Sequence, residues 1–458
     1  MSLSEELVVL GAGPAGLAAA LTAARAGRSV VVVEGSDRIG GMAASIEVGG
    51  QRVDLGSHRL HRASPPAVMA LVQELLGDDL QPRPRSGRIR LGGRWLGFPL
   101  RPLDVLRHAP PALSIGFACD LVTAPWRSTT TDTFAEQVRA GPGPTLLDRF
   151  YAPYARKLWD RDPDALSGEL FRRRVGARSA GSLAARVLRR RSDQPGFWYP
   201  RRGFGQVVDA LADAAVDAGV DIRCGEPLVD LRRAGDRWCV TTSSRELDAP
   251  LVVSTIPNRA LVDTVDAPAP IRDAAGELTH RGALLVYLVV ERDAYTPFDA
   301  HYFPEPDVTM ARLSEPKNYR DGDDPPGVTV LCAEIAASVG DGLWSASDDD
   351  LAADVASDLA RSGLPPVDGA PSTVVRLPNV YPVYDLGAAA AQHAVEAWVS
   401  AQPGLALVGR QALFAHDNTH HALEMGITAG RLAGASTGWD PVAWSAARHR
   451  FRDHVVED

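Results

Sequence analysis

A glycine-rich turn near the N-terminus constrains the fold more than any other feature of this sequence. The apolar run Leu7 to Leu10 is followed by Gly11-Ala12-Gly13-Pro14-Ala15-Gly16. Residues 16–26 are rich in Ala and Leu and predict a helix, and residues 29–33 predict a second buried strand. Strand, helix and strand in this order are the repeating unit of a doubly wound parallel sheet. The sequence therefore predicts an α/β fold with a Rossmann-type domain.

The turn and the residue that ends the second strand together predict a dinucleotide site. The glycines of the turn, with Pro14 and Ala15 between them, allow the backbone to approach a pyrophosphate closely. The start of the following helix offers N–H groups and a partial positive charge. Glu34 lies 18 residues beyond Gly16, where its carboxylate can accept hydrogen bonds from ribose hydroxyls.

A second glycine pair favours FAD over NAD. Arg38, Gly40, Gly41 and Met42 follow Glu34 closely, and the two glycines would let the chain pass close to the phosphates and ribityl chain of a flavin. This extension is typical of one superfamily of flavoproteins. Because no Cys or His stands in an attachment motif, we expect the FAD to be bound noncovalently.

Charge and hydropathy narrow the classes of partner. The net charge of −9 gives no general attraction to nucleic acid. The first six residues lack the basic start of a secretory signal, and the most apolar later run, residues 112–126, is too short to span a bilayer. We therefore expect a cytoplasmic protein without a transmembrane segment, whose partner is a small-molecule substrate. The sequence leaves the oligomeric state open.

Later apolar runs divide the chain into interleaved segments. We expect the FAD-binding domain to be discontinuous and to comprise residues 1–80, 200–265 and 400–440. Residues 81–199 are rich in Arg, lack strand alternation and predict a helical insertion. Residues 266–399 carry strand candidates at 284–290, 328–335 and 373–377, and predict an antiparallel sheet in a mixed α+β substrate domain.

Several short motifs occur in an order that is similar to one group of FAD flavoenzymes. They are Asp54-Leu55-Gly56-Ser57-His58-Arg59-Leu60-His61, Tyr154-Ala155-Arg156-Lys157-Leu158-Trp159, Tyr199-Pro200-Arg201-Arg202-Gly203-Phe204, Thr309-Met310-Ala311-Arg312, Tyr381-Pro382-Val383-Tyr384 and Gly409-Arg410. Through these blocks the chain resembles the superfamily of amine oxidases, protoporphyrinogen oxidase and phytoene desaturases. In motif order it most resembles UDP-galactopyranose mutase-like proteins, but it departs from their pattern between Ala415 and His421.

The resemblance implies further flavin contacts. Gly56, Ser57 and His58 would approach the flavin, and His61 would lie beside its isoalloxazine ring, where an imidazole can move a proton near neutral pH. The backbone at Val229 would pair with the adenine. The last flavin-binding block would contribute Gly409, Arg410, Asn418 and Met425. We expect the final helix to begin near Ala422, with N–H groups at Met425 and Gly426 close to the flavin C2 carbonyl.

The same resemblance implies substrate-binding residues. Arg178 and Arg312 stand where the mutases carry arginines for a sugar nucleotide, and guanidinium groups there would grip a diphosphate. Tyr381 and Tyr384 would either hydrogen-bond that diphosphate or form an aromatic wall beside the flavin.

A run of histidines near the C-terminus invites comparison with metal sites. His416, His420 and His421 lie close to Asp417 in the sequence. No cysteine accompanies them, and the last flavin-binding block accounts for the same residues. We therefore predict no bound metal there.

Two classes of function remain. The leading hypothesis is an FAD-dependent oxidoreductase that removes a hydride from a C–H bond next to nitrogen, oxygen or an unsaturated carbon. The alternative is a non-redox mutase, in which flavin N5 attacks the anomeric carbon of a nucleotide sugar. The departure between Ala415 and His421 favours the oxidoreductase, because the reactive edge of the flavin is expected there. The intact glycine turn argues against a third class, a binding module without activity.

Overall fold

Short β-branched runs build a parallel sheet at the centre of the nucleotide-binding half. The computed structural model describes residues 3–98, 100, 108–174, 196–436 and 438–456. All four residues of each of β2 (Leu7–Leu10), β3 (Val30–Val33) and β15 (Leu251–Ser254) are buried, as expected for a parallel sheet covered on both faces. With β11 (Asp221–Arg223) and β21 (Leu405–Leu407) they form a five-stranded sheet in the order β11-β3-β2-β15-β21. The predicted α/β fold is confirmed.

Different layers cover the two faces of this sheet. Val9 and Val32 point to one face and pack with α1 (Pro14–Arg25), α10 (Gln206–Asp217) and α17 (Thr419–Gly434). Val8 and Val31 point to the other face and pack against a small sheet of β12 (Leu228–Ala234), β13 (Arg237–Thr242) and β14 (Glu246–Ala249), and against α15 (Ala388–Ser400). Strand alternation therefore produces a three-layer arrangement.

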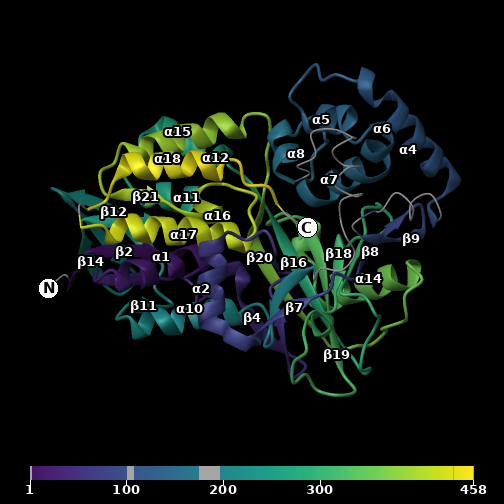
Figure 1. Ribbon diagram of the computed structural model, residues 1–458, viewed down its shortest axis with the longest axis horizontal. Helices are drawn as coiled ribbons and strands as arrows, with labels where there is room; N and C mark the ends of the chain where they lie inside the picture. Colours follow the sequence, from purple (N-terminus) through teal and green to yellow (C-terminus); the bar gives the residue numbers. More distant parts are fainter. Residues whose placement is uncertain (1–2, 99, 101–107, 175–195, 437, 457–458) are drawn as a thin grey trace.

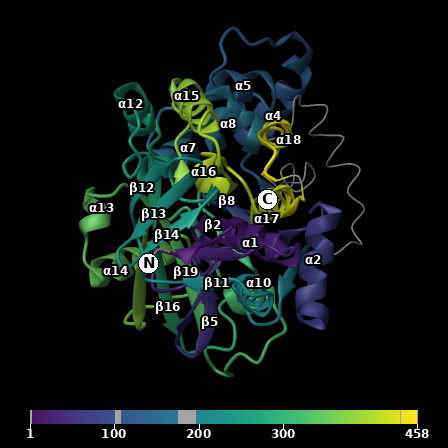
Figure 2. The ribbon, with the colours of Figure 1, turned by 90° about the vertical axis from the view of Figure 1, so that its left-hand side faces the viewer.

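Small residues bring α1 and α17 into close contact, and Figures 1 and 2 both show these helices side by side. A Cβ atom on Gly426 would lie 2.2 Å from the carbonyl oxygen of Ala15, and one on Gly430 would lie 2.5 Å from that of Ala19. Because the two contacts advance in the same direction along both helices, α1 and α17 run parallel. Their N-termini therefore face the same edge of the sheet.

A seven-stranded sheet forms the other half of the molecule, in the order β20-β16-β19-β18-β17-β8-β9. Three of its strands were predicted and are longer in the structure: β16 (His280–Val290), β19 (Thr329–Ala337) and β20 (Ser372–Pro382). The other four were not predicted. Among them, β8 (Gly87–Leu91) and β9 (Arg94–Phe98) come from the region expected to be helical, and β8 pairs with β17 (Ala300–Tyr302) in parallel. The sheet therefore contains both parallel and antiparallel strand pairs, and two of its strands precede the helical region in the sequence. The remaining strand is β18 (Arg312–Ser314).

A group of helices lies beside one end of this sheet, at the upper right of Figure 1. They are α4 (Pro111–Thr123), α5 (Phe134–Ala140), α6 (Pro144–Leu146), α7 (Ala152–Trp159) and α8 (Gly168–Arg174). Within the ranges that the structure describes, no helix combines the length and the apolar character needed to cross a membrane.

The remaining elements connect these layers or cover their edges. They are β1 (Leu3–Ser4), β4 (Ser45–Val48), β5 (Gln51–Asp54), β6 (Leu60–His61), α2 (Pro66–Leu76), β7 (Leu80–Arg83), β10 (Phe197–Pro200), α11 (Asn258–Val262), α12 (Ala269–Glu277), α13 (Gly342–Ser345), α14 (Asp348–Arg361), α16 (Gly409–Ala412) and α18 (Pro441–Phe451).

Candidate flavin site and substrate pocket

The glycines of the N-terminal turn serve two separate purposes. A Cβ atom on Gly16 would lie 2.0 Å from the carbonyl oxygen of Gly11, so Gly16 lets α1 pack tightly against the turn. At Gly13 a Cβ atom would meet nothing within 4 Å, and at Gly41 its nearest neighbour would be the Cα of Gly13 at 3.5 Å. Gly13 and Gly41 therefore border open space beside the N-terminus of α1, which has no side-chain cap. Such a cradle fits a pyrophosphate.

Glu34 is held against this turn by hydrogen bonds. Its Oε2 accepts from the backbone N of Ala12 at 2.8 Å, and its Oε1 accepts from the backbone N and the hydroxyl of Ser36 at 2.9 and 2.8 Å. The second glycine segment folds over the same turn, since the N–H of Gly40 donates to the carbonyl of Ala12 at 2.8 Å. The structure thus brings together the turn, Glu34 and the segment from Arg38 to Met42.

Replacing Glu34 by alanine is expected to weaken FAD binding roughly 10- to 150-fold. A hydrogen bond to a charged group contributes about 1.5–3 kcal/mol, and we expect the carboxylate to accept from the hydroxyls of the adenosine ribose. Fluorescence titration of the apoprotein with FAD measures this loss. Glu47, exposed in β4, is the matched control, and its alanine variant should bind FAD as the wild type does. Equal affinities for all three proteins would mean that the ribose is held elsewhere.

The final helix, α17, begins earlier than the sequence predicted. It begins at Thr419, three residues before Ala422, and Asn418 caps it in a capping box with His421. Met425 is the seventh helical residue and is fully buried, so its N–H belongs to the helical ladder and does not point out of the helix end. The polar run before Ala422 concealed this cap. N–H groups outside the helical ladder are therefore found in the first turn of α17 and not at Met425.

The first turn of α17 lies beyond the pyrophosphate cradle. Gly426 packs against Ala15 at the start of α1, whereas α17 begins seven residues before Gly426. At about 1.5 Å per residue, α17 reaches roughly 10 Å past α1. There it adjoins the substrate sheet, because the ring of His416 contacts the carbonyl of Pro382 at the end of β20, with Nε2 at 2.9 Å. A flavin with its pyrophosphate at α1 would have its ring system near this second helix terminus.

The segment from Gly56 to His61 lies between the two halves. Gly56 has a positive φ of 88°. The N–H of Ser57 donates to Glu334 at 2.8 Å, and the Ser57 hydroxyl lies 2.7 Å from that of Tyr319. His58 stacks on Phe204 with ring centroids 5.3 Å apart, and burial lowers its pKa. Burial thus favours the neutral form of His58, and the contacts of Ser57 and His58 fix the segment in place.

A hydrogen bond from the backbone defines the tautomer of the neutral His61 ring. The N–H of Ala63 donates to its Nδ1 at 3.1 Å, so the ring proton of the neutral imidazole lies on Nε2. The centroid of the His61 ring is 6.4 Å from that of His420, in the first turn of α17. The structure therefore places the His61 ring next to the first turn of α17.

The predicted substrate arginine Arg312 is already paired. Its Nε and Nη2 donate to the two carboxylate oxygens of Glu334 at 2.8 and 2.6 Å. The Arg312 side chain is 20% exposed and that of Glu334 only 5%. This bidentate pair is close to neutral, so the charge of Arg312 is compensated before any diphosphate binds. Arg178, the other predicted arginine, lies outside the described residues.

Tyr384 and Arg410 support the loop that precedes α17. The Tyr384 hydroxyl donates to the carbonyl of Phe414 at 2.9 Å and accepts from the N–H of His416 at 3.2 Å. The Nη1 and Nη2 of Arg410 donate to the carbonyls of Asp417 and Val380 at 2.8 and 2.6 Å, while its buried Nε has no partner within the described residues. This orphaned N–H fits a cofactor that occupies the adjoining space.

Three further predicted site residues are Tyr381, Gly409 and Val229. Tyr381 is partly exposed. Burial raises the pKa of its hydroxyl to about 12; the charge of Glu334 also raises this pKa, and the charge of Arg312 lowers it. A Cβ atom on Gly409 would lie 2.7 Å from that of Ala15, so this glycine permits a close approach to α1. The side chain of Val229 is exposed in β12, at the edge of the small sheet.

Glu334 is a site residue that motif reasoning missed. It is the one charged residue of β19, whose other residues are Thr, Val, Leu, Cys, Ala and Ile, and all of them are buried. A single carboxylate in such a run signals a buried partner. That signal was present in the sequence.

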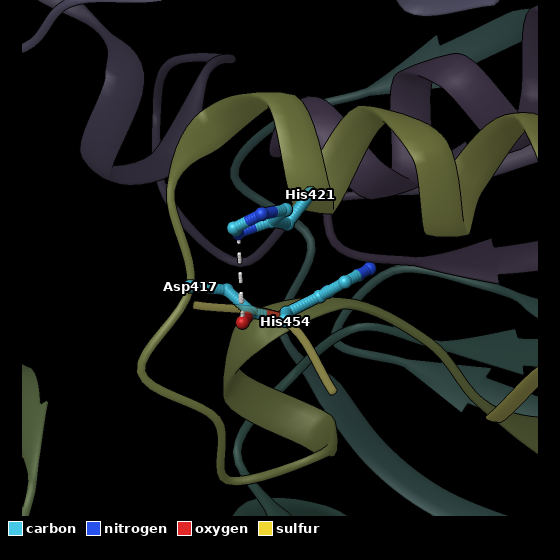
Figure 3. A group of neighbouring side chains, drawn as sticks. All are labelled: Asp417, His421 and His454. Carbon is cyan, nitrogen blue, oxygen red and sulfur yellow. Dashed lines mark hydrogen bonds and ion pairs between the residues drawn. The ribbon is translucent and has the colours of Figure 1, made fainter. Parts of the chain in front are cut away.

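His454 was missed as well, and it completes a cluster near the start of α17 (Figure 3). Donor atoms of Asp417, His421 and His454 all lie within 4.8 Å of one another. His416 points elsewhere, to Pro382. The cluster therefore differs from the one that the sequence suggested.

Known proteins share both sequence and fold with this chain. It is 29% identical over 320 residues to phytoene dehydrogenase of Streptomyces griseus, a match that covers 60% of this chain and 57% of that protein. It is also 29% identical over 287 residues to a Mycobacterium tuberculosis protein named as a flavin-containing monoamine oxidase, covering 58% of this chain and 60% of that protein. The chain thus spans less than two thirds of the length of these curated relatives.

Structure and family comparison agree with these matches. The solved structure of reduced UDP-galactopyranose mutase superposes with a TM-score of 0.82, covering 99% of this chain and 100% of that one at 20% identity, so the fold is shared. The family model described as flavin containing amine oxidoreductase matches residues 14–436. Both the predicted superfamily and the predicted cofactor are confirmed. The chain belongs to the flavin-containing amine oxidoreductase family, and its cofactor is FAD.

Proposed function

We propose that this protein is an FAD-dependent oxidoreductase that removes a hydride from a small-molecule substrate. Bound FAD supplies the electron acceptor for such an oxidation. The observation that carries the choice between the two hypotheses is the pair of Arg312 and Glu334, in which a carboxylate already compensates the charge of one arginine that was expected to grip a diphosphate. An oxidoreductase needs no such grip.

Side chains around the expected flavin ring have roles in this proposal. The first turn of α17 presents its N–H groups and partial positive charge to the ring, which favours electron acceptance. His61 offers a donor on Nε2 for hydrogen bonding or proton transfer. Tyr381 contributes an aromatic surface next to the Arg312–Glu334 pair.

The domain division belongs to the same proposal. Residues 1–80, 200–265 and 400–440 would bind FAD, and residues 266–399 would bind the substrate together with the helical insertion. Within 81–199, the strands β8 and β9 pair into the substrate sheet, so we assign residues 87–98 to that sheet.

The mutase remains a second candidate because its fold covers the whole of this chain. It requires a diphosphate site, but two donor nitrogens of Arg312 already bind Glu334, and the Tyr384 hydroxyl already donates to the carbonyl of Phe414. We therefore rank it below the oxidoreductase.

Anaerobic mixing of the FAD-loaded protein with amines, polyenes and nucleotide sugars tests the proposal. An amine or polyene should bleach the visible flavin band without added reductant. UDP should leave the flavin spectrum and melting temperature unchanged, whereas a true ligand at one hundred times its dissociation constant adds about 2.7 kcal/mol of stability. A UDP response together with turnover of a nucleotide sugar only after prior reduction would instead establish the mutase.

A further inference from the structure

His454 lies just beyond the end of α18 and bridges two carboxylates that flank the first turn of α17. Its Nδ1 is 3.4 Å from Oδ2 of Asp417, the residue before the N-cap, and its Nε2 is 3.4 Å from Oε2 of Glu424 in the second turn. Its ring stacks on that of His421, with centroids 4.1 Å apart and planes inclined by 12°. Figure 3 shows the three side chains Asp417, His421 and His454 together.

The contacts of His454 define its protonation state. Each ring nitrogen faces a carboxylate oxygen, and a carboxylate only accepts, so both nitrogens carry a proton. Burial opposes the charged form, but the hydrogen bonds to Asp417 and Glu424 outweigh it and raise the pKa of His454 to about 9. His454 is therefore an imidazolium at neutral pH.

A shared metal ion does not fit this cluster. The nitrogen lone pairs of an imidazole lie in the ring plane, so two rings stacked at 12° direct their lone pairs side by side and not toward one point. The Nδ1 of His421 accepts from the N–H of Asn418 at 3.2 Å. An Arg173 guanidinium nitrogen lies 3.8 Å from Oδ1 of Asp417, where it would repel a cation. Hydrogen bonds and ion pairs, and not a metal ion, hold these side chains together.

The cluster anchors the helix end that faces the flavin. Asp417 directly precedes the N-cap Asn418, its side chain is buried, and its carbonyl accepts from Arg410. Beyond His454, the N–H of Val456 donates to the carbonyl of Arg173 at 2.6 Å, which ties the tail to α8. The tail thus fixes the loop that sets the position of the first turn of α17.

We propose that His454 is a positioning residue that fixes the first turn of α17 and adds a positive charge beside it, and thereby raises the reduction potential of the bound flavin. A cation near a helix N-terminus that faces the ring adds to the helix dipole in stabilising negative charge there. This inference requires only bound FAD. It is independent of the proposed substrate and survives if the oxidoreductase proposal fails.

Three variants test it by equilibrium reduction of the FAD-loaded protein against a reference dye. His454→Gln keeps a hydrogen-bond donor and removes the charge, and it should lower the equilibrium constant for flavin reduction about tenfold, or about 30 mV for two electrons. His454→Arg, which restores the charge, should stay within about threefold of wild type. His449→Gln, on the exposed side of α18, is the control and should change nothing. A wild-type potential for His454→Gln would overturn the proposal.

Titration of the wild type provides a second readout that needs no variant. The charged and titratable groups that face His454 or Asp417 are Asp417, His421 and Glu424 from the α17 region, Arg173 from α8, and Arg452 and Asp453 beside it in the chain. The folded-state pKa is raised above the ordinary value of about 6.5, so the contribution of His454 is complete below that pH and is lost as the pH rises through about 9. The potential should therefore fall more steeply across this range in wild type than in His454→Gln.

The metal content of the purified protein is a third measurement that tests the proposal. The purified protein should contain no stoichiometric metal that depends on His454. A metal present in wild type and missing from His454→Gln would overturn the proposal, because the ring nitrogens would then bind the ion and not protons.

Discussion

Replacing Arg312 by alanine is expected to destabilise the folded protein by about 3–5 kcal/mol. The substitution leaves the carboxylate of Glu334 buried without its bidentate partner, and breaking a buried ion pair from one side has this cost. Urea denaturation of the FAD-free protein measures the loss. If Arg312 were instead an uncommitted substrate arginine, its removal would leave stability nearly unchanged.

Two further variants control this experiment. Arg232→Ala removes an exposed arginine that pairs with Asp230 on the surface, and it should leave stability close to that of wild type, because solvent screens such a pair. The double variant Arg312→Met with Glu334→Leu should recover most of the loss, because two apolar side chains replace a buried pair. Near wild-type stability for Arg312→Ala alone would contradict the pairing and restore the argument for a diphosphate site.

Replacing Gly426 by alanine is expected to destabilise the protein by about 3 kcal/mol and to weaken FAD binding. The new Cβ would lie 2.2 Å from the carbonyl oxygen of Ala15 and 2.9 Å from the Cβ of Ala18, so α1 and α17 must separate. Because both helices direct their N-termini at the flavin, their displacement alters both ends of the cofactor site.

Gly276→Ala is the matched control for this prediction. Gly276 also lies in a helix, α12, but a Cβ atom there would meet nothing within 4 Å. Alanine has the higher helix propensity, so this variant should be more stable than wild type by up to about 1 kcal/mol. Equal gains at both positions would show that α1 and α17 are not packed through Gly426.

The FAD-binding half was predictable because its signals are local. The strand, turn and helix from Leu7 to Arg25 are adjacent in sequence, and each has its own pattern. The start of α17 was misplaced because Asn418 caps the helix within a polar run that masks the usual onset of apolar periodicity. Met425 was therefore assigned a role that belongs to the first turn.

The substrate half was harder because its contacts are long-range. β8 contains Arg88 and Arg90 and pairs with a strand more than 200 residues later in the chain, which no local pattern reveals. Arg312 was found by motif, but its partner Glu334 lies on the neighbouring strand and changes what Arg312 can bind. His454 reaches Asp417 only through the fold.

Reconstitution of the FAD-free protein with FAD tests whether the cradle at α1 binds the cofactor. We expect one FAD per chain, a visible flavin spectrum, and complete release of intact FAD on acid precipitation. We also expect that Gly13→Val, which fills the open space of the pyrophosphate cradle, folds but takes up no FAD. A wild-type protein that stays colourless after addition of FAD, or Gly13→Val that binds FAD normally, would show that the cofactor is not bound at this cradle.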